Sequence, residues 1–455
     1  METITTINPA TEKEIKTYKR DSKEEALNKV EIANKAYLNW KNTSFEERSK
    51  LMHKLADIFD KKKNEYANLA TEEMGKIISQ SKKEIEKCAL VCRYYADNIE
   101  ELLADKIIET EAKKSYVTYQ PLGVTLAVMP WNFPFYQVIR FAAPALMTGN
   151  TAVLKHASNV QGCAYALENA FKEAGFPSGT FTNLNVTSKL IKPIIEDENI
   201  VAVTLTGSEP AGRSVAKIAG ENLKKTVLEL GGSDAYIVLD DADLEKATDL
   251  ATFGRLQNNG QTCIAAKRFI VLEGIYDDFL KLFTKKMQDA KLGNPTDEDA
   301  YFGPMARIDL RNEIHEQVEK TIKQGGKLVL GGKIPDRVGA FYPATILSEL
   351  KPGMTAFDEE LFGPVASVIK AKDEDEAIEL ANNSTFGLGS GVLTGNSERG
   401  EKIALQLEAG NSFVNKLVAS DPRMPFGGIK NSGYGRELSS YGIKEFVNTK
   451  SIWID

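Results

Sequence analysis

Short runs of apolar and β-branched residues alternate with amphipathic helical segments from about residue 115 onward, and this alternation restricts the fold more than any other feature. TAVLKHA is followed by QGCAYALENAFKEAG, and VASVIKA is followed by KDEDEAIELANN. Parallel strands need a crossover connection of this length, so the pattern predicts βαβ units. We expect two parallel sheets, one before about residue 231 and one after it.

Residues 22–104, ahead of these units, have the pattern of helices. One apolar face recurs at spacings of four and three residues: Ala26, Val30, Ala33, Tyr37 and Trp40. Ser44 and Glu47 form a capping box that begins the next helix. Cys88 and Cys92 share a face of a later helix. Since no further Cys or His lies nearby in the sequence, we expect core packing rather than metal binding.

A chain of 455 residues is long enough for two or three domains with large cores. Its formal net charge of −7 argues against nucleic acid as the main partner. Four cysteines do not describe a disulfide scaffold and fit a reducing compartment, so we expect a cytoplasmic protein. A polar N-terminus and the lack of any apolar run of about 18 residues predict neither a signal peptide nor a membrane span.

One of the four cysteines, Cys263, follows a polar glycine turn in NNGQTCIAAKRF. A cysteine kept for packing normally has apolar neighbours, whereas Cys263 follows Gly260 and precedes Lys267 and Arg268. Cationic neighbours and access to solvent stabilise a thiolate. The segment therefore predicts a cysteine that a substrate can reach.

Two segments are candidates for binding a nucleotide, although the usual GxGxxG fingerprint is missing. TLTGSEPAG ends a strand and begins a helix, whose N-terminal N–H groups suit a pyrophosphate, although the same turn also suits a plain helix cap. TAVLKHAS ends a buried strand with Lys155, where a lysine either holds a ribose or phosphate or simply faces water.

Five segments together resemble the motifs of the aldehyde dehydrogenase superfamily in order and spacing. They are PWNFP at 130–134, LELGGSD at 228–234, NNGQTC at 258–263, EELFGPV at 359–365 and PFGGIKNSGYGRE at 425–437. The resemblance runs from about residue 5 to the C-terminus. AVMPWNFPF and LKHAS bring the chain nearest to the short bacterial succinate-semialdehyde dehydrogenase branch.

The resemblance implies three catalytic residues. Cys263 matches the nucleophile that attacks the aldehyde, and Asn132 matches the amide that, with the backbone N–H of the cysteine, stabilises the oxyanion. Glu229 matches the general base that activates water to hydrolyse the thioester. CoA-acylating members lack this base, so a free carboxylate is the expected product.

The resemblance also implies a dinucleotide site and no metal. The matching positions are Trp131, Lys155, His156, Ser158, Thr206, Gly207, Ser208, Leu230, Glu360 and Phe362. Several NAD-preferring relatives carry glutamate where this chain has Ser158. A carboxylate there binds a 2′-hydroxyl and repels a 2′-phosphate, so serine beside Lys155 predicts a preference for NADP, with NAD possible.

For the substrate, the resemblance points to succinate semialdehyde. Arg140 matches an arginine that receives the distal carboxylate, Ser420 matches a serine that assists, and Tyr136 lines the tunnel or packs in the core. Many relatives have a second arginine where this chain has Gln257, which weakens carboxylate recognition or widens the substrate range. Some carry another cysteine where this chain has Ala265, so a local disulfide switch is not expected.

The implied fold is α/β, with two Rossmann-like parallel-sheet domains and a small β oligomerisation element. The expected cofactor-binding domain comprises residues 1–102 and 122–231 and returns near 430–440, and the catalytic domain comprises 232–429. Residues 103–121 and 441–455 form the oligomerisation element of a homodimer or homotetramer. Two alternative functions stay open: oxidation of other small or aliphatic aldehydes, and a thiol esterase that needs no cofactor.

Overall fold

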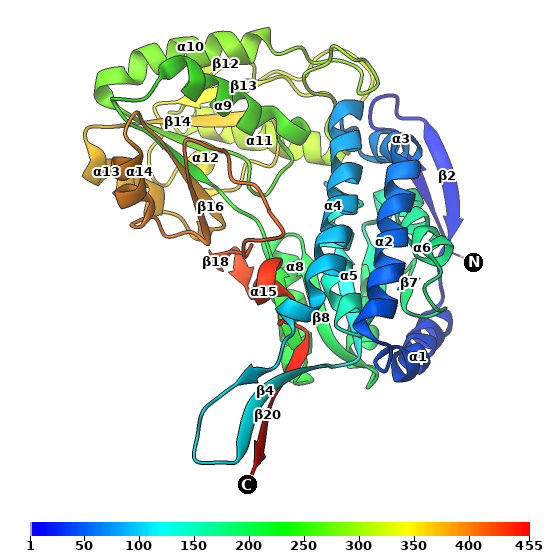
Figure 1. The fold of residues 1–455 in the computed structure, drawn as a ribbon. Coiled ribbons are helices and arrows are strands. Elements are labelled where there is room, and N and C mark those ends of the chain that lie inside the picture. The colour runs from blue at the N-terminus through cyan, green and yellow to red at the C-terminus, as the bar shows by residue number, and fades with distance from the viewer. Residues whose placement is uncertain (1) are drawn as a thin grey trace.

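The computed structural model of the protein describes residues 2–455, which form two α/β bodies and a projecting arm (Figure 1). The chain begins with a hairpin and four helices: β1 (Thr3–Ile7), β2 (Glu14–Lys19), α1 (Lys23–Trp40), α2 (Phe45–Lys61), α3 (Lys63–Met74) and α4 (Ile78–Leu102). The predicted capping box of Ser44 and Glu47 begins α2, and the predicted apolar face of α1 is buried apart from the half-buried Tyr37.

The first body is built on a six-stranded sheet in the order β19-β9-β8-β5-β6-β7. Its strands are β19 (Gly433–Tyr434), β9 (Lys225–Glu229), β8 (Ile200–Thr206), β5 (Val124–Met129), β6 (Thr151–His156) and β7 (Phe181–Asn183). Its helices are α5 (Tyr136–Met147), α6 (Gln161–Ala174), α7 (Ile191–Glu196) and α8 (Glu209–Glu221). Successive residues such as Leu126 and Ala127 enter different cores, because strand side chains alternate between faces. Helices α2 to α6 cover one face, and α1, α7 and α8 cover the other.

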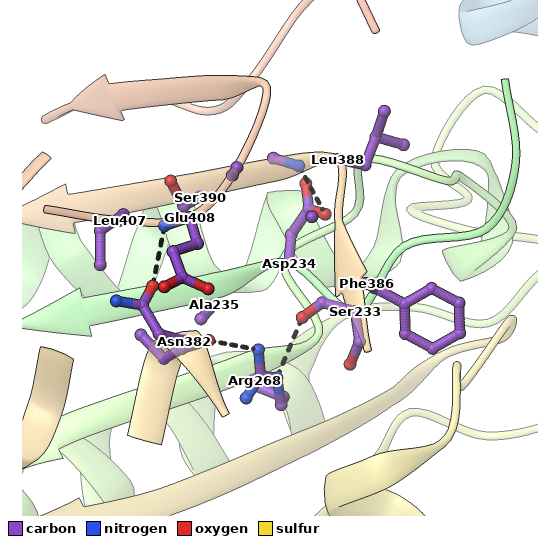
Figure 2. Close-up of a pocket in the computed structure, with 14 residues that line it drawn as sticks. Ser233, Asp234, Ala235, Arg268, Asn382, Phe386, Leu388, Ser390, Leu407 and Glu408 are labelled. Carbon is purple, nitrogen blue, oxygen red and sulfur yellow. Dashed lines mark hydrogen bonds between the residues drawn. The ribbon is translucent and has the colours of Figure 1, made fainter. Parts of the chain in front are cut away.

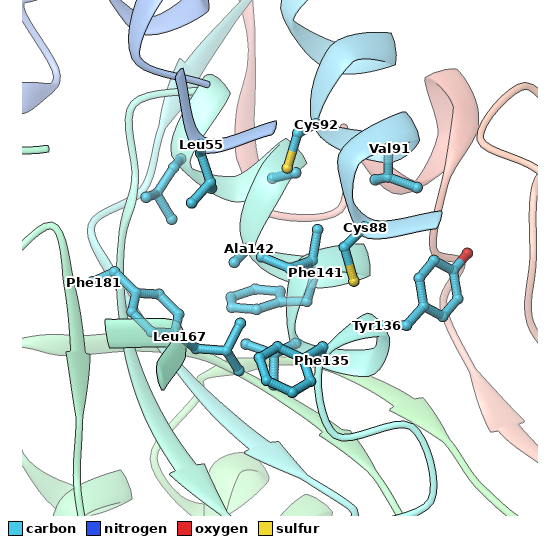
Figure 3. Packing of buried hydrophobic residues seen from close by; sticks show 14 of the residues in the cluster. Leu55, Cys88, Val91, Cys92, Phe135, Tyr136, Phe141, Ala142, Leu167 and Phe181 are labelled. Atoms are coloured by element: carbon cyan, nitrogen blue, oxygen red, sulfur yellow. The ribbon is translucent and has the colours of Figure 1, made fainter. Parts of the chain in front are cut away.

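Cys88 and Cys92 lie in the core between α2, α4 and α5, as the helical pattern predicts. Both are fully buried, and Figure 3 shows their sulfur atoms pointing into the same apolar cluster as Leu55, Val91 and Phe141. No group of side chains with the makings of a metal site occurs within residues 2–455. These two thiols therefore serve packing.

The second body is built on a seven-stranded sheet in the order β12-β13-β14-β11-β10-β16-β17. Its strands are β12 (Lys327–Leu330), β13 (Thr345–Ser348), β14 (Val365–Ala371), β11 (Arg268–Leu272), β10 (Ala235–Val238), β16 (Gly389–Leu393) and β17 (Asn411–Val414). Its helices are α9 (Leu244–Leu256), α10 (Tyr276–Asp289), α11 (Ile308–Lys323), α12 (Thr355–Asp358), α13 (Glu374–Asn382) and α14 (Ser397–Ala404). The predicted α/β class with two parallel sheets is confirmed, except that the edge strands β12 and β19 run antiparallel to their neighbours.

The register of the first sheet gathers the ends of its strands at one edge. Thr206 pairs with Glu229 across β8 and β9, and Met129 pairs with His156 across β5 and β6. The chain passes from the end of β9 through a short loop to the start of β10 in the second sheet. The carboxyl edge of the first sheet is thereby joined to the amino edge of the second. Ligands bind at the carboxyl ends of the strands in open α/β sheets, which is the edge where Thr206 and Glu229 lie.

A three-stranded antiparallel sheet forms the arm that projects from the two bodies in Figure 1, with the C-terminus at its end. Its strands are β3 (Lys106–Ile107), β4 (Lys114–Pro121) and β20 (Val447–Ile454), and the short helix α15 (Ser439–Gly442) precedes β20. A small pairing of β15 (Phe386–Gly387) with β18 (Ile429–Lys430) completes the fold. Within residues 2–455, no helix has the length and apolar character that crossing a bilayer requires.

Candidate active site

The loop before Cys263 has a backbone that its sequence explains. Asn258 and Asn259 both adopt left-handed conformations, with φ of 53° and 58°, and asparagine tolerates this region better than most residues other than glycine. Gly260 has φ of +74°, and a Cβ at this position would lie 2.3 Å from the carbonyl of Gly363 in the EELFGPV segment. The NNG sequence is therefore needed for the turn and for its close approach to the neighbouring motif.

Hydrogen bonds from the same loop fix the position of Asn132. The Asn258 side-chain amide donates to the carbonyl oxygens of Asn132, at 2.8 Å, and Gln261, at 3.0 Å. The Asn132 amide donates in turn to the Gln261 carbonyl at 3.1 Å. An amide nitrogen has two hydrogens, so one N–H of Asn132 is left over. Because Asn132 and Cys263 line the same cleft, that N–H is available to an oxyanion formed beside the sulfur.

The Cys263 thiol is partly buried in this cleft, and it does not rest as a thiolate. Burial raises its pKa to about 12, although the charges of Arg140 and Lys267 lower it. The expectation that Lys267 and Arg268 surround the sulfur with cations needs correction. Lys267 donates to the Cys263 carbonyl rather than contacting the sulfur, and Arg268 donates to three backbone carbonyls elsewhere.

Glu229 ends β9 as a buried carboxyl group, and neither of its oxygens has a hydrogen-bond partner. Burial and the nearby Glu437 raise its pKa well above the ordinary value, while Arg140 opposes this shift. The carboxyl group of Glu229 therefore stays protonated to higher pH than that of an exposed glutamate. A raised pKa of this kind brings a carboxylate base closer to working pH.

Lys267 connects the nucleophile loop to the EELFGPV segment. Its ammonium group is buried and donates to the carbonyl oxygens of Gly232 and Cys263 at 2.5 and 2.6 Å, and to Glu360 at 2.8 Å. Glu360 also accepts the backbone N–H of Gly232 at 3.0 Å. A Cβ at Gly231 would lie 2.3 Å from the Glu360 carboxylate, so any larger residue there would displace Glu360 from this position. Lys267 thus connects three segments of the chain, at Gly232, Cys263 and Glu360.

A cleft of about 560 Å³ extends from Cys263 to the N-terminus of α8. Predicted cofactor residues that line it are Trp131, Thr206, Gly207, Ser208, Leu230, Glu360 and Phe362. Ser208 is the N-cap of α8, yet its side chain caps none of the backbone N–H groups, and the buried Thr206 hydroxyl has no partner. An uncapped helix N-terminus beside an orphan hydroxyl fits the pyrophosphate of a dinucleotide. Such a cofactor, when bound, supplies the hydride acceptor.

The other predicted cofactor residues lie around β6. Lys155 and Ser158 line a second cavity of about 520 Å³, which Arg307 of the second body also lines. Burial and repulsion from Arg20 lower the pKa of Lys155, as expected for a cation placed to receive an anion. His156 is placed differently: its ring is buried and lies 2.8 Å from the Pro134 carbonyl, so it supports the PWNFP loop. Burial lowers its pKa to about 4 and keeps it neutral.

The structure brings together three of the four predicted substrate residues. The Tyr136 hydroxyl is 2.8 Å from Ser420 Oγ, and the Arg140 guanidinium lies over the Tyr136 ring at 5.9 Å. Arg140 is buried and paired with Glu437, which leaves its Nη2 without a partner. Gln257 is half-buried before the nucleophile loop, and its side chain forms no hydrogen bond within residues 2–455.

A very small cavity lies behind the site and is shown in Figure 2. Its volume is about 10 Å³, too little for a substrate. Arg268 donates from its Nε to the Ser233 carbonyl at 2.9 Å, and Asp234 accepts the Gly389 N–H at 3.0 Å. Burial raises the pKa of Asp234 to about 7. This region supports the loop between β9 and β10 rather than binding a ligand.

Sequence reasoning missed the partners of several site residues. Lys267 was visible four positions after Cys263, but nothing in the sequence showed that it reaches Glu360. Glu437 lies inside the fifth motif, and its pairing with Arg140 required the fold. Nothing in the sequence distinguishes Lys87 from other lysines in helical segments, yet its ammonium group donates to Ser420.

Comparison with known proteins agrees with this geometry. Residues 1–452 match the family described as the aldehyde dehydrogenase family. The NADP(+) succinate-semialdehyde dehydrogenase 1 of Mycobacterium tuberculosis is 48% identical over 454 residues, which are 99% of this chain and 99% of that protein. An aldehyde dehydrogenase of Paenarthrobacter nicotinovorans is also 48% identical over 454 residues, with the same coverage.

Among solved structures, the chain is similar to the succinic semialdehyde dehydrogenase of Streptococcus pyogenes in complex with NADP+ as the cofactor. The TM-score is 0.97 at 40% sequence identity, and the match covers 99% of each chain. The fold of this chain is therefore similar to that structure over 99% of its length.

Proposed function

Because the chain belongs to the aldehyde dehydrogenase family, we propose that it oxidises succinate semialdehyde to succinate with NADP+ as the preferred hydride acceptor. The family resemblance predicted from the five motifs is confirmed, and the chain is an NAD(P)-dependent oxidoreductase. The observation that carries the proposal is the single cleft that Cys263 and Asn132 share with the uncapped N-terminus of α8.

The proposed reaction uses Cys263 and Asn132, which line this cleft, and Glu229, which is buried and does not line it. Cys263 loses its thiol proton to water, and the thiolate attacks the aldehyde carbon to form a tetrahedral adduct. The spare N–H of Asn132 and the backbone N–H of Cys263 stabilise its oxyanion, and losing one such donor costs about 3 to 4 kcal/mol of barrier. Once hydride has left, a thioester remains on Cys263. Glu229 takes a proton from water while the water oxygen attacks the thioester carbon; the C–S bond then breaks, succinate is released, and the Cys263 thiolate recovers its proton from Glu229.

A panel of aldehydes assayed by absorbance at the reduced-nicotinamide band tests this proposal. We expect kcat/KM for succinate semialdehyde to exceed that for butanal by at least about tenfold, because a charge-assisted contact stabilises only the substrate with a carboxylate. We also expect NADP+ to be used better than NAD+. Good turnover of uncharged aldehydes without turnover of succinate semialdehyde would instead favour an enzyme for small aliphatic aldehydes. Hydrolysis without cofactor would favour an esterase.

Ser158 is the position that we propose sets cofactor choice. Ser158→Glu should lower the ratio of kcat/KM for NADP+ over NAD+ by at least about tenfold, because a carboxylate beside the 2′-phosphate brings like charges together. Ser188→Glu is the matched control, since it adds the same charge at an exposed serine outside both cavities. An unchanged ratio in Ser158→Glu would contradict this role.

We further propose that the chain forms a homodimer or homotetramer through its arm, in a cytoplasmic setting. Ile107, Trp453 and Ile454 on the arm are 64%, 53% and 45% exposed, and large exposed apolar side chains on a projecting sheet favour burial against another chain. All four cysteines are free thiols, which supports a reducing compartment.

A further inference from the structure

A lysine from outside all five motifs reaches the predicted carboxylate site. Lys87 lies on α4, and its ammonium group donates to Ser420 Oγ at 2.7 Å. The same ammonium lies 4.5 Å from the centre of the Tyr136 ring, and the Tyr136 hydroxyl is 2.8 Å from Ser420 Oγ. Lys87 is partly buried, so its charge is not simply dispersed into bulk water.

The charges around Lys87 leave an excess of positive charge at this point. Arg140 is paired with Glu437, and Asp421 is paired with Arg423 at 2.7 Å. Lys87 itself pairs with no carboxylate among residues 2–455. A partly buried ammonium whose only hydrogen-bond partner is a hydroxyl is stabilised when an anion arrives.

The pKa of Lys87 agrees with this imbalance. Burial and repulsion from Arg140 on α5 lower it to about 8. The charged and titratable groups that act on Lys87 from the surrounding elements are Arg140, Cys88, Asp421 and Glu84. The two carboxylates and the thiol oppose the shift without reversing it. An anion bound beside the ammonium would raise the pKa again.

We propose that Lys87 is a specificity-determining residue that receives the distal carboxylate of the substrate, together with Ser420 and the free Nη2 of Arg140. This inference rests on the proposed function, since it assigns a contact to the carboxylate of the same substrate. It also supplies a second cation beside Arg140, whose own charge is paired with Glu437. Binding exchanges one neutral partner of the ammonium, the serine hydroxyl, for a charged one.

Lys87→Met is the first test, because methionine keeps an unbranched stem beside Tyr136 and removes the charge. The quantity measured is the ratio of kcat/KM for succinate semialdehyde to that for butanal. We expect this ratio to fall by about 10- to 100-fold in Lys87→Met and to recover at least in part in Lys87→Arg. Lys83→Met, an exposed lysine one turn earlier on α4, is the matched control and should keep the wild-type ratio.

A second measurement needs no variant. In the wild-type enzyme the same ratio should fall as pH rises through about 8, because the ammonium loses its proton in the free enzyme, whose state kcat/KM reports. Taking the ratio cancels the pH dependence of the thiol, which both aldehydes share. In Lys87→Met the ratio should not depend on pH. In Lys87→Arg the ratio should keep its neutral-pH value to a higher pH than in the wild type.

The outcomes separate this inference from the function on which it rests. A wild-type enzyme with no preference for the semialdehyde overturns both. A wild-type preference that Lys87→Met leaves intact, and that does not change between pH 7 and 9.5, overturns the role of Lys87 and leaves the proposed function standing. The lower pH lies about one unit below the pKa of Lys87, and the higher pH lies more than one unit above it. Equal losses on both aldehydes in Lys87→Met would show a merely structural role.

Discussion

Replacing Cys263 with alanine is expected to lower kcat by at least about 10⁴-fold, because no other group in the cleft can form the covalent adduct. Cofactor binding should persist, since the surfaces at α8 and Glu360 are untouched by the change. The measurement is steady-state reduction of NADP+ by succinate semialdehyde, with cofactor binding followed by tryptophan fluorescence. Cys92→Ala is the control, because that thiol is buried in the core and serves only packing.

The pH dependence of alkylation gives an independent check on the same sulfur. The thiolate is the reactive form, and a pKa raised to about 12 leaves little of it at neutral pH. The rate of alkylation by iodoacetamide should therefore climb by about tenfold per pH unit across the neutral range, in proportion to the thiolate. Turnover in Cys263→Ala within tenfold of wild type, or an alkylation rate already level at pH 7, would contradict this description of the nucleophile.

Much of the fold could be predicted because it depends on local patterns. The apolar face of α1 and the capping box of α2 appear in the sequence at helical spacing, and both occur in the structure. The strand-and-helix alternation predicts parallel sheets because few other connections are possible. The antiparallel edge strands β12 and β19 were missed. Their direction is set by long-range pairing, about which a short apolar run carries no information.

The positions of the candidate site residues could be predicted for a related reason. Thr206 and Glu229 end neighbouring strands, and parallel strands bring their carboxyl ends to one edge. The partners of the side chains could not be predicted, because they join distant segments. Lys87 and Ser420 are 333 residues apart, and Lys267 and Glu360 are 93 apart.

The electrostatic state of the site was the least predictable part. Lys267 and Arg268 follow Cys263 closely in the sequence and suggest a stabilised thiolate. In the structure Arg268 donates to backbone carbonyls, and Lys267 donates to backbone carbonyls and to Glu360. Burial then dominates the pKa of the thiol. The exposure and direction of a side chain depend on how the whole chain packs. Residue type and spacing alone therefore predict a lowered pKa for Cys263, whereas the pKa is raised.

Glu229→Gln is expected to stop the enzyme after one turnover. The first reduction of NADP+ should proceed, giving a burst that matches the number of active sites. Hydrolysis of the thioester should then be slower by about 10²- to 10⁴-fold, the range that a general base contributes. Glutamine keeps the shape of the side chain and cannot take a proton from water. Rapid mixing followed by absorbance at the reduced-nicotinamide band measures both phases.

Mass spectrometry and chemical rescue distinguish failed hydrolysis from failed binding. The stalled variant should carry a succinyl group on Cys263, and hydroxylamine should release it, because that nucleophile attacks a thioester without needing a base. Continued turnover beyond the burst would contradict the role of Glu229. Absence of any burst would show instead that the substitution disturbs the steps before the thioester.

The pH profile of wild-type hydrolysis completes the argument for Glu229. Burial and the Glu437 carboxylate raise its pKa, so the proton-bound form persists to higher pH than in an exposed glutamate. Only the deprotonated form can accept a proton from water, and hydrolysis should therefore accelerate as pH rises through this elevated pKa. Glu437→Gln removes the repelling charge and leaves Arg140 without its carboxylate partner, so the pKa of Glu229 should fall and the rising limb should move to lower pH. A limb that stays in place would show that the charge of Glu437 does not contribute to the pKa of Glu229.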